Sequence, residues 1–301
     1  MAYVWAASIP LVMVAALLFA TGAALQQSIA RSAARTASRP NGWLPALSLM
    51  GTLLRNRWWL IGWAGNIVGF LLHATALHLG SIAVVQALLT VQLLFALPLA
   101  VVRRRGVKLR RTDWLGTGLV CSGLVVLVAQ GIPHGELRRD LVPWAIAVAV
   151  LAMVTLVSVA RVLRHHAQTR SALVAVAAGI CFSVTAMLLV LTTDDLPHVS
   201  WPLPCVALST LVGGLLAQDA FASGSLPTAL TAMTITDPTV SYVAGAVLVD
   251  VAYTPHVLPL GFSGALVIGG VILLANSPTL HDERETPEPV RTLADVVPSE
   301  P

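Results

Sequence analysis

The stretch LVPWAIAVAVLAMVTLVSVA, residues Leu141–Ala160, contains no charged side chain. A helix needs about 20 apolar residues to cross the hydrocarbon core of a bilayer, and this stretch has that length. Backbone groups in lipid must be hydrogen-bonded within their own segment, so such a run is expected to be helical. The short runs of alternating polarity that are typical of a transmembrane β-barrel are not visible in the sequence. The stretch therefore predicts a transmembrane α-helix.

Similar apolar runs fill most of the chain and predict an all-α, polytopic transmembrane bundle of about nine spans. The 301 residues are 56% hydrophobic and only 11% charged, whereas a soluble domain carries about 25% charged residues. None of the runs contains Lys or Arg, as the cost of placing a charge in hydrocarbon requires. Besides Leu141–Ala160, the predicted spans are Tyr3–Ile29, Trp58–Leu79, Ile82–Val102, Trp114–Gly131, Ser171–Thr192, Trp201–Ser223, Leu226–Val251 and Val257–Asn276.

Two segments near the N-terminus allow more than one interpretation. The first apolar run could be a cleaved signal peptide, but no Lys or Arg precedes it and it is too long. We therefore expect a mature first helix. The stretch Trp43–Leu54 is apolar but short for a crossing, so we expect an interfacial or re-entrant segment. If that stretch did cross the membrane, the bundle would have ten spans and the N-terminus would lie on the opposite side.

The Lys and Arg residues predict the orientation of the bundle. With the N-terminus outside, every one of the 18 Lys and Arg residues except Arg138 and Arg139 falls in an internal loop or the C-terminal tail. This asymmetry is the positive-inside pattern, and it predicts a multi-pass protein of the plasma or inner membrane with a cytoplasmic C-terminus. Residues 1–277 form the predicted membrane domain. Residues 278–301 are acidic and proline-rich, which predicts a disordered cytoplasmic tail.

Two parts of the chain resemble each other at a nearly constant spacing. The run ALHLGS, residues 76–81, resembles AFASGS, residues 220–225, and Thr90 then falls on Thr234. In the predicted orientation the paired spans run in opposite directions. Inverted repeats of this kind are typical of secondary transporters, whose substrate sites lie near the bilayer midplane. The two predicted repeat halves are residues 1–131 and 141–277.

The sequence around this repeat resembles the drug/metabolite transporter (EamA-like) superfamily. The likeness lies in Trp63, Phe70 and the run ALHLGSIAVV from Ala76, which a basic turn and the run DWLGTG from Asp113 follow. The second copy ends in a similar glycine-rich run, LGFSGALVIGGVILL from Leu260. The resemblance implies a helical membrane transporter, and the nine-span count is closer to the NIPA-like magnesium transporter branch than to the ten-span majority.

The chain also departs from the pattern of that superfamily. The helix after the short turn often contains an early proline in such families, but here the first proline is Pro98. The acidic residue that is common at the end of that helix is replaced by Arg103–Arg105. We therefore carry over the fold and the transporter class but no substrate.

Asp237 is the strongest site candidate, because it lies near the middle of a predicted span. A carboxylate at that depth costs about 2.5–3.5 kcal/mol on insertion scales, so it is expected to face a cavity or a partner. Pro238 cannot donate a backbone hydrogen bond and frees a carbonyl near Thr234, while Thr236 adds a hydroxyl. Broken helices of this type line transporter sites. The alternative is a structural kink that holds local Thr hydrogen bonds and a protonated Asp.

Neighbouring spans supply the other candidates. Asn66 and His73 are two turns apart and share a helix face. His73 could be a cation ligand, a proton carrier or an interhelical hydrogen-bond donor. Asp219 lies near the end of a span, which favours a structural role. The candidate substrate- or ion-binding residues are Asp237, Thr234, Thr236, Thr90, Gln86, Gln92, His73, Asn66 and Asp219.

These features together predict a secondary transporter or facilitator of a small polar or cationic solute, working by alternating access. Asp237 would act as a cation ligand or a proton acceptor. The alternatives are a NIPA-like magnesium transporter and a non-transporting membrane scaffold subunit. No His box, phosphate-binding loop or metal-ligand spacing is visible, so we predict neither an enzyme nor a cofactor.

The expected partners are membrane lipids and a small-molecule or ionic substrate. Nucleic acid is not expected, because the basic loop at Arg103–Arg111 would lie beside anionic lipid headgroups. The sequence leaves open whether two copies associate as a homodimer.

Overall fold

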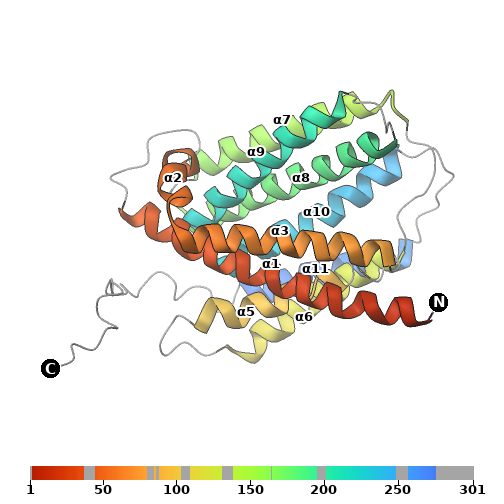
Figure 1. Ribbon diagram of the computed structural model, residues 1–301, viewed down its shortest axis with the longest axis horizontal. Helices are drawn as coiled ribbons and strands as arrows, with labels where there is room; N and C mark the ends of the chain where they lie inside the picture. The colour runs from red at the N-terminus through yellow and green to blue at the C-terminus, as the bar shows by residue number, and fades with distance from the viewer. Residues whose placement is uncertain are drawn as a thin grey trace.

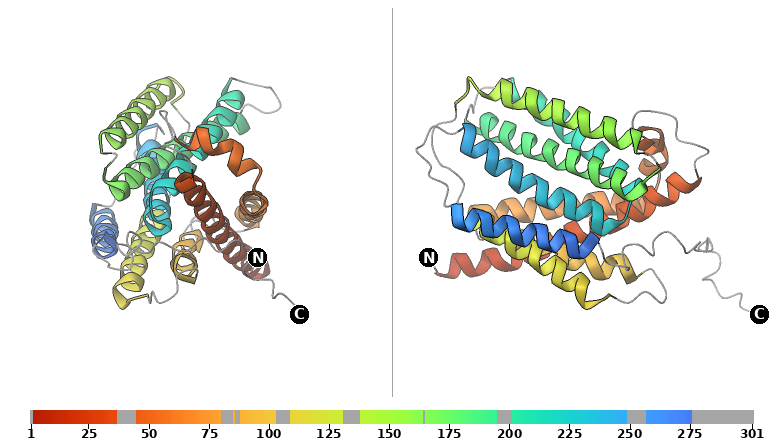
Figure 2. Two further views of the ribbon diagram at one scale, coloured as in Figure 1. Left: turned by 90° about the vertical axis from the view of Figure 1, so that its left-hand side faces the viewer. Right: turned by 180° about the vertical axis from the view of Figure 1, so that it is seen from behind.

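The computed structural model describes residues 2–36, 45–79, 85, 88–102, 109–130, 138–163, 165–194, 201–248 and 257–275. All regular structure in these ranges is helical, which confirms the predicted all-α class. The long helices run roughly along one axis and form a bundle (Figure 1, Figure 2). The described helices, including the short α2, are α1 (Ala2–Thr36), α2 (Pro45–Leu54), α3 (Arg57–Leu79), α5 (Gln92–Val102), α6 (Arg111–Ala129), α7 (Val142–Val162), α8 (Ala167–Asp194), α9 (Pro202–Ser223), α10 (Leu226–Leu248) and α11 (Val257–Ala275).

Five helices in the described part of the chain are long and apolar enough to cross a membrane. The clearest is α7, because only 6% of its most apolar window is buried inside the bundle. Leu151 and Val162 on this helix are exposed, an arrangement that suits lipid and would be costly in water. The chain is therefore a helical membrane protein, and the count of nine spans stays a prediction. The five helical segments are Ser8–Thr36, Arg57–Ala76, Val142–Val162, Ala167–Leu188 and Pro202–Ser223.

One predicted span is interrupted within its described part. The sequence predicted a single helix over Ile82–Val102, but Thr90 and Val91 form a turn and α5 begins after them. The N–H of Leu93 donates to the Thr90 carbonyl over 3.1 Å, which is an i+3 rather than an i+4 bond. The thiol of Cys121 on α6 donates to the same carbonyl over 3.3 Å. This partner helps to satisfy a backbone oxygen that lacks its regular helical bond.

The segment for which an interfacial or re-entrant role was predicted contains the short helix α2. Its ten residues would extend about 15 Å, half of the hydrocarbon thickness of a bilayer. The helix packs against α1, α3 and α9, and Leu49 and Leu53 belong to the buried core. Trp43 lies outside the described residues. The length of α2 therefore agrees with a segment that does not cross the membrane.

Small residues bring the helices close together. The main pairs are α1 with α3, α8 with α9, α6 with α11, and α8 with α10. Where α6 crosses α11, a Cβ at Gly116 would come within 3.0 Å of the carbonyl oxygen of Gly270. Membrane helices associate through such close backbone approach, because lipid provides no hydrophobic force between them. The core accordingly contains many alanines, among them Ala20, Ala23, Ala30, Ala175, Ala177, Ala178, Ala217 and Ala220.

One end of the bundle, which we call the basic end, is where α1 and α9 finish and α3, α8 and α10 begin. A hydrogen bond links two of these helices near this end: the side-chain amide of Gln27 on α1 donates to the carbonyl of Gly224, just after α9, over 3.1 Å. At the opposite end, the backbone N–H of Arg138 donates to the Leu248 carbonyl over 2.7 Å. The arginines at or next to the helix termini of the basic end are Arg31, Arg35, Arg55, Arg57, Arg161 and Arg170.

Candidate functional site

The carboxylate of Asp237 lies where α10 crosses α8. A Cβ at Gly179 on α8 would lie 2.7 Å from the Cβ of Thr236, so only glycine permits this approach. One turn further along α8, the Ser183 hydroxyl lies 3.0 Å from Oδ1 of Asp237. The close crossing therefore delivers a hydroxyl from a neighbouring helix to the carboxylate.

Hydroxyl groups are the polar partners of Asp237. Ser183 has one hydroxyl proton but lies within hydrogen-bond distance of three acceptors, the Gly179 carbonyl at 3.1 Å, the Asp237 carbonyl at 2.8 Å and Oδ1. The hydroxyl of Ser241, one turn along α10, also hydrogen-bonds to the carboxylate. Within the described residues, no Lys, Arg or His forms an ion pair with Asp237. The charge of this carboxylate is thus not balanced by a basic side chain in that part of the chain.

A third helix reaches the same region from the other side. The side-chain amide of Gln92, at the start of α5, donates to the Thr234 hydroxyl over 3.3 Å. Thr234, Asp237 and Ser241 are three and four residues apart and share one face of α10. Pro238 has no N–H to offer the Thr234 carbonyl, so this oxygen lacks its regular helical partner. The site is therefore built from α5, α8 and α10.

The other threonine candidates have mainly local roles. Thr236 faces Gly179, and its hydroxyl donates to the Ala232 carbonyl of its own helix over 2.7 Å. Thr90 is buried at the turn before α5, where its carbonyl accepts from Cys121. Gln86 lies outside the described residues.

Asn66 and His73 are placed away from the Asp237 group. Both lie on α3, whose main neighbours are α1 and α2. Oδ1 of Asn66 lies against the backbone of Gly22 on α1. Buried polar atoms without a hydrogen-bond partner in the described part of the chain include Oδ1 of Asn66 and Nδ1 of His73. Their shared face, which the sequence predicted, is therefore turned toward α1 and not toward α10.

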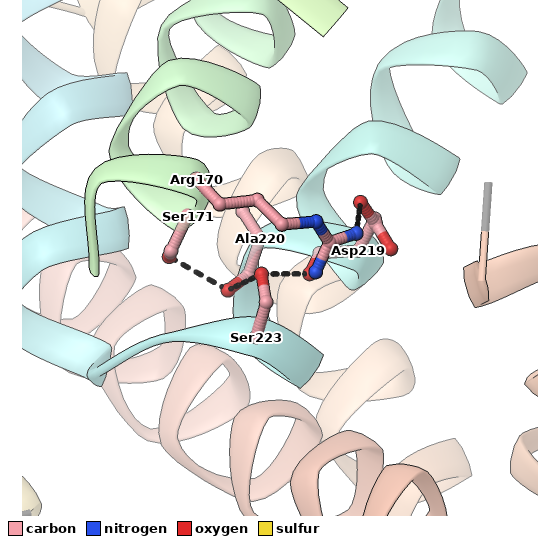
Figure 3. A network of polar contacts seen from close by, with 5 residues as sticks. All are labelled: Arg170, Ser171, Asp219, Ala220 and Ser223. Atoms are coloured by element: carbon pink, nitrogen blue, oxygen red, sulfur yellow. Dashed lines mark hydrogen bonds and ion pairs between the residues drawn. The ribbon is translucent and has the colours of Figure 1, made fainter. Parts of the chain in front are cut away.

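Asp219 is paired with a basic residue. Its Oδ2 lies 2.6 Å from a guanidinium nitrogen of Arg170, and its side chain is 2% exposed (Figure 3). Buried ion pairs of this kind persist because each charge satisfies the other. Asp219 thus belongs to the basic end of the bundle and lies outside the Asp237 group.

Three residues of these sites were not among the sequence candidates, namely Ser183, Ser241 and Arg170. Ser183 follows Gly179 by four residues, and this small-xxx-small spacing is a signal for close helix packing that could have identified the crossing. Arg170 precedes a long apolar run and was assigned to a loop, but it lies in the first turn of α8. Its partner could not be found from the sequence, because Asp219 is far away along the chain.

No group of three or more His, Cys, Asp or Glu residues that could hold a metal ion is found within the described ranges.

The sequence of the chain was compared with those of known proteins. No protein-family model matches the chain, and no solved structure matches it. An uncharacterized protein of Corynebacterium glutamicum is 28% identical over 245 residues, which cover 76% of this chain and 83% of the relative. The similarity thus extends over most of the length of both chains.

Proposed function

We propose that the protein is a secondary transporter or facilitator that moves a small polar or cationic solute by alternating access. The observation that carries this proposal is the placement of Asp237 at the meeting point of α5, α8 and α10. Its carboxylate is held by hydroxyls of Ser183 and Ser241, and no ion pair balances it within the described residues. A carboxylate inside a membrane bundle is expensive and typically marks a path for an ion, a proton or a substrate.

The chemistry of the site favours a monovalent cation or a proton as the charged species. One carboxylate, three hydroxyls and the amide of Gln92 provide a single negative charge and several neutral oxygens. A bound monovalent cation would neutralise the Asp237 carboxylate and leave no net charge at the site. Mg²⁺ prefers six oxygen ligands in octahedral geometry and would leave an excess positive charge here. A NIPA-like magnesium activity is therefore the second candidate, supported by the sequence resemblance alone.

The helix pairing supports the proposed inverted repeats. If α1, α3, α5 and α6 correspond to α8, α9, α10 and α11, then the pair α1·α3 corresponds to α8·α9. The pair α1·α5 likewise corresponds to α8·α10, and α6 pairs with its own counterpart α11. The turn at Thr90 and the helix that contains Pro238 also occupy corresponding positions. Such symmetry fits a nine-span, EamA-like transporter with its site between the halves.

The arginines support an orientation for this transporter. We infer that the basic end faces the cytoplasm, because Arg and Lys are retained on that side of a membrane. The membrane itself would then be the plasma or inner membrane, with the solute path running from the basic end to the opposite end through the Asp237 region.

Proton flux in proteoliposomes tests the proposal. Purified protein is reconstituted with the pH-sensitive dye pyranine inside, and a panel of amines, quaternary cations, polar metabolites and Mg²⁺ is added with and without a pH gradient. We expect a cation-dependent pH change for the wild-type protein and at least a tenfold loss for Asp237→Asn. Asp237→Glu should retain part of the flux, because it keeps the charge.

Asp140→Asn is the matched control, since Asp140 is a surface carboxylate with an exposed side chain beside Arg138. It should transport like the wild type. Equal flux in wild type and Asp237→Asn would remove Asp237 from the mechanism. Absence of flux for every solute class in folded protein would favour the membrane scaffold.

A further inference from the structure

The basic end of the bundle contains a buried polar network that the proposed site does not use. It begins where α9 meets α8, with the ion pair between Arg170 and Asp219 (Figure 3). Beside it, the Ser171 hydroxyl donates to the Ala220 carbonyl over 2.8 Å. The Ser223 hydroxyl donates to the Asp219 carbonyl over 2.8 Å within α9. The contacts of Arg170 and Ser171 attach the last turns of α9 to the start of α8.

From this attached end, Gln218 reaches across to two other helices. Its side-chain amide donates to Oε1 of Gln26 on α1 over 2.6 Å. Its own Oε1 accepts from the indole N–H of Trp59 on α3 over 3.0 Å. Gln26, Trp59 and Gln218 are all buried. A single glutamine therefore joins α1, α3 and α9, using both its donor and its acceptor.

A second contact between α1 and this region lies nearer the end of α9. The amide of Gln27, next to Gln26 on α1, donates to the Gly224 carbonyl at the α9–α10 connection. Three hydrogen bonds thus connect α1 and α3 to α9 and its connection to α10. Under the proposed repeat, α1 and α3 belong to the first half and α9 and α10 to the second.

The two sets of bonds differ in what they connect. The bonds of Arg170 and Ser171 lie within the second half, whereas those of Gln218 and Gln27 run between the halves. Alternating access in repeat-built transporters is largely a rigid-body movement of one half or bundle against the other. Such a movement breaks bonds between the halves and keeps those within a half.

The network lies closer to the basic end of the bundle than the Asp237 carboxylate does, as a gate at that end requires. Asp237 is eleven residues after the first residue of α10, which corresponds to about 16 Å along the helix. This is about half of the hydrocarbon thickness of a bilayer. Gln218 lies five residues before the end of α9, which is about 7 Å from that end. The carboxylate of Asp237 therefore lies roughly 9 Å deeper in the bundle than Gln218 along the helix axes.

We propose that Gln218, together with Gln26, Gln27 and Trp59, is the gate that closes the basic end of the solute path. The inference rests on the proposed function and adds to it the contacts that open and close. The pair Arg170–Asp219 keeps the α9 end fixed to α8, so that Gln218 is presented to the opposite half as part of a rigid unit. The alternative is a permanent brace that holds α1, α3 and α9 together during all steps.

Reversible cross-linking separates a gate from a brace. In a background without Cys121, Cys181 and Cys205, Gln26→Cys is combined with Gln218→Cys and joined by a short, reducible bifunctional thiol reagent. The gate predicts at least a tenfold loss of flux for the cross-linked protein and recovery after reduction. Full flux with the cross-link in place would overturn it.

The matched control joins two helices of the same half, with Ser171→Cys and Ala220→Cys. These residues already lie in contact, and the proposed movement does not separate them. Cross-linking should leave flux within twofold of the uncross-linked protein. If both pairs block flux equally, the network is a general brace and the gate is rejected.

A labelling experiment decides the question without any transported solute. Thr234→Cys places a thiol on the α10 face of the proposed site, and a membrane-impermeant maleimide is added from the side of the basic end. With Gln218→Leu or, separately, Gln27→Leu to open the gate, the labelling rate should rise at least fivefold. An unchanged rate in whichever variant folds would overturn the gate. A raised rate in a protein that transports nothing would keep the gate and reject the transport function.

Discussion

Asp219 and Asp237 are carboxylates in the interior of the same helical bundle, and their surroundings differ. Asp219 lies at the basic end, 2.6 Å from the guanidinium of Arg170. Asp237 lies further inside the bundle and is held by the hydroxyls of Ser183 and Ser241. A carboxylate beside a guanidinium has its charge balanced by the protein itself. A carboxylate beside hydroxyls is solvated but not neutralised, which leaves room for an external cation or a proton.

The same comparison predicts which substitutions reduce the stability of the fold and which reduce transport. Removing Arg170 should destabilise the fold, because the carboxylate of Asp219 would stay buried without the opposite charge beside it. Removing the charge of Asp237 should leave the fold intact and abolish transport. The variants below test this difference, beginning with the largest expected effect.

Arg170→Met should give the largest loss of stability. The substitution removes the guanidinium that lies beside Asp219, while the carboxylate stays buried where α8 packs against α9. Breaking a buried pair in this way costs about 3–5 kcal/mol. We expect a marked decrease in the temperature at which the detergent-solubilised protein unfolds, measured by the fluorescence of its tryptophans.

The double variant Arg170→Met with Asp219→Leu is the control for this expectation. Replacing both charges with apolar side chains of similar volume removes the uncompensated charge, so stability should recover most of the loss. A double variant as unstable as the single one would show that Arg170 acts through packing and not through its charge.

Gly179→Ala should give the next largest effect. Its Cβ would lie 2.7 Å from the Cβ of Thr236 and 3.2 Å from the Met233 carbonyl, so α8 and α10 must move apart. Overpacking of this kind costs about 1–3 kcal/mol. Gly118→Ala is the matched control, because nothing lies within 4 Å of a Cβ at that position. Equal unfolding temperatures for both variants would contradict a tight α8–α10 crossing.

The helical class of the chain could be predicted from the sequence, and the reason is physical. A charge-free run such as Leu141–Ala160 must satisfy its backbone internally in lipid, so its secondary structure follows from its length and polarity. The interruption at Thr90 was not predicted. The Thr90 carbonyl at this turn accepts from a thiol of another helix, Cys121 on α6, and no pattern in the local sequence predicts such a contact.

The residues of the candidate site could be predicted only where the pattern lies within the sequence of a single helix. Asp237 beside Pro238 is visible as a charge and a helix disruption within an apolar run. Asn66 and His73 both lie on α3, but the sequence could not say that α3 packs mainly against α1. Which helices meet is decided by packing between segments far apart in the chain. Ser183 and Arg170 became visible through that packing.

The serines of the two regions provide a smaller and more selective comparison. Ser183→Ala removes a hydroxyl from Asp237, and Ser171→Ala removes one from the Ala220 carbonyl. Each should cost about 1 kcal/mol of stability, as for a typical hydrogen bond. Only Ser183→Ala should alter cation-dependent proton flux, measured in the same proteoliposomes. A change of flux in both variants would show that the two regions are not functionally separate.

The smallest expected effect on stability is that of Asp237→Asn. The amide keeps an oxygen that can accept from Ser183, introduces no clash and removes a charge from the interior of the bundle, so the free energy of unfolding should stay within about 0.5 kcal/mol of the wild type. The matched change Asp219→Asn should cost more, because it turns a charge-assisted hydrogen bond to Arg170 into a neutral one, about half as strong. Thermal unfolding of both variants in one detergent gives the comparison directly. If Asp237→Asn were the more damaging of the two, Asp237 would be stabilising α10 beside Pro238, and the scaffold would account for this carboxylate better than transport does.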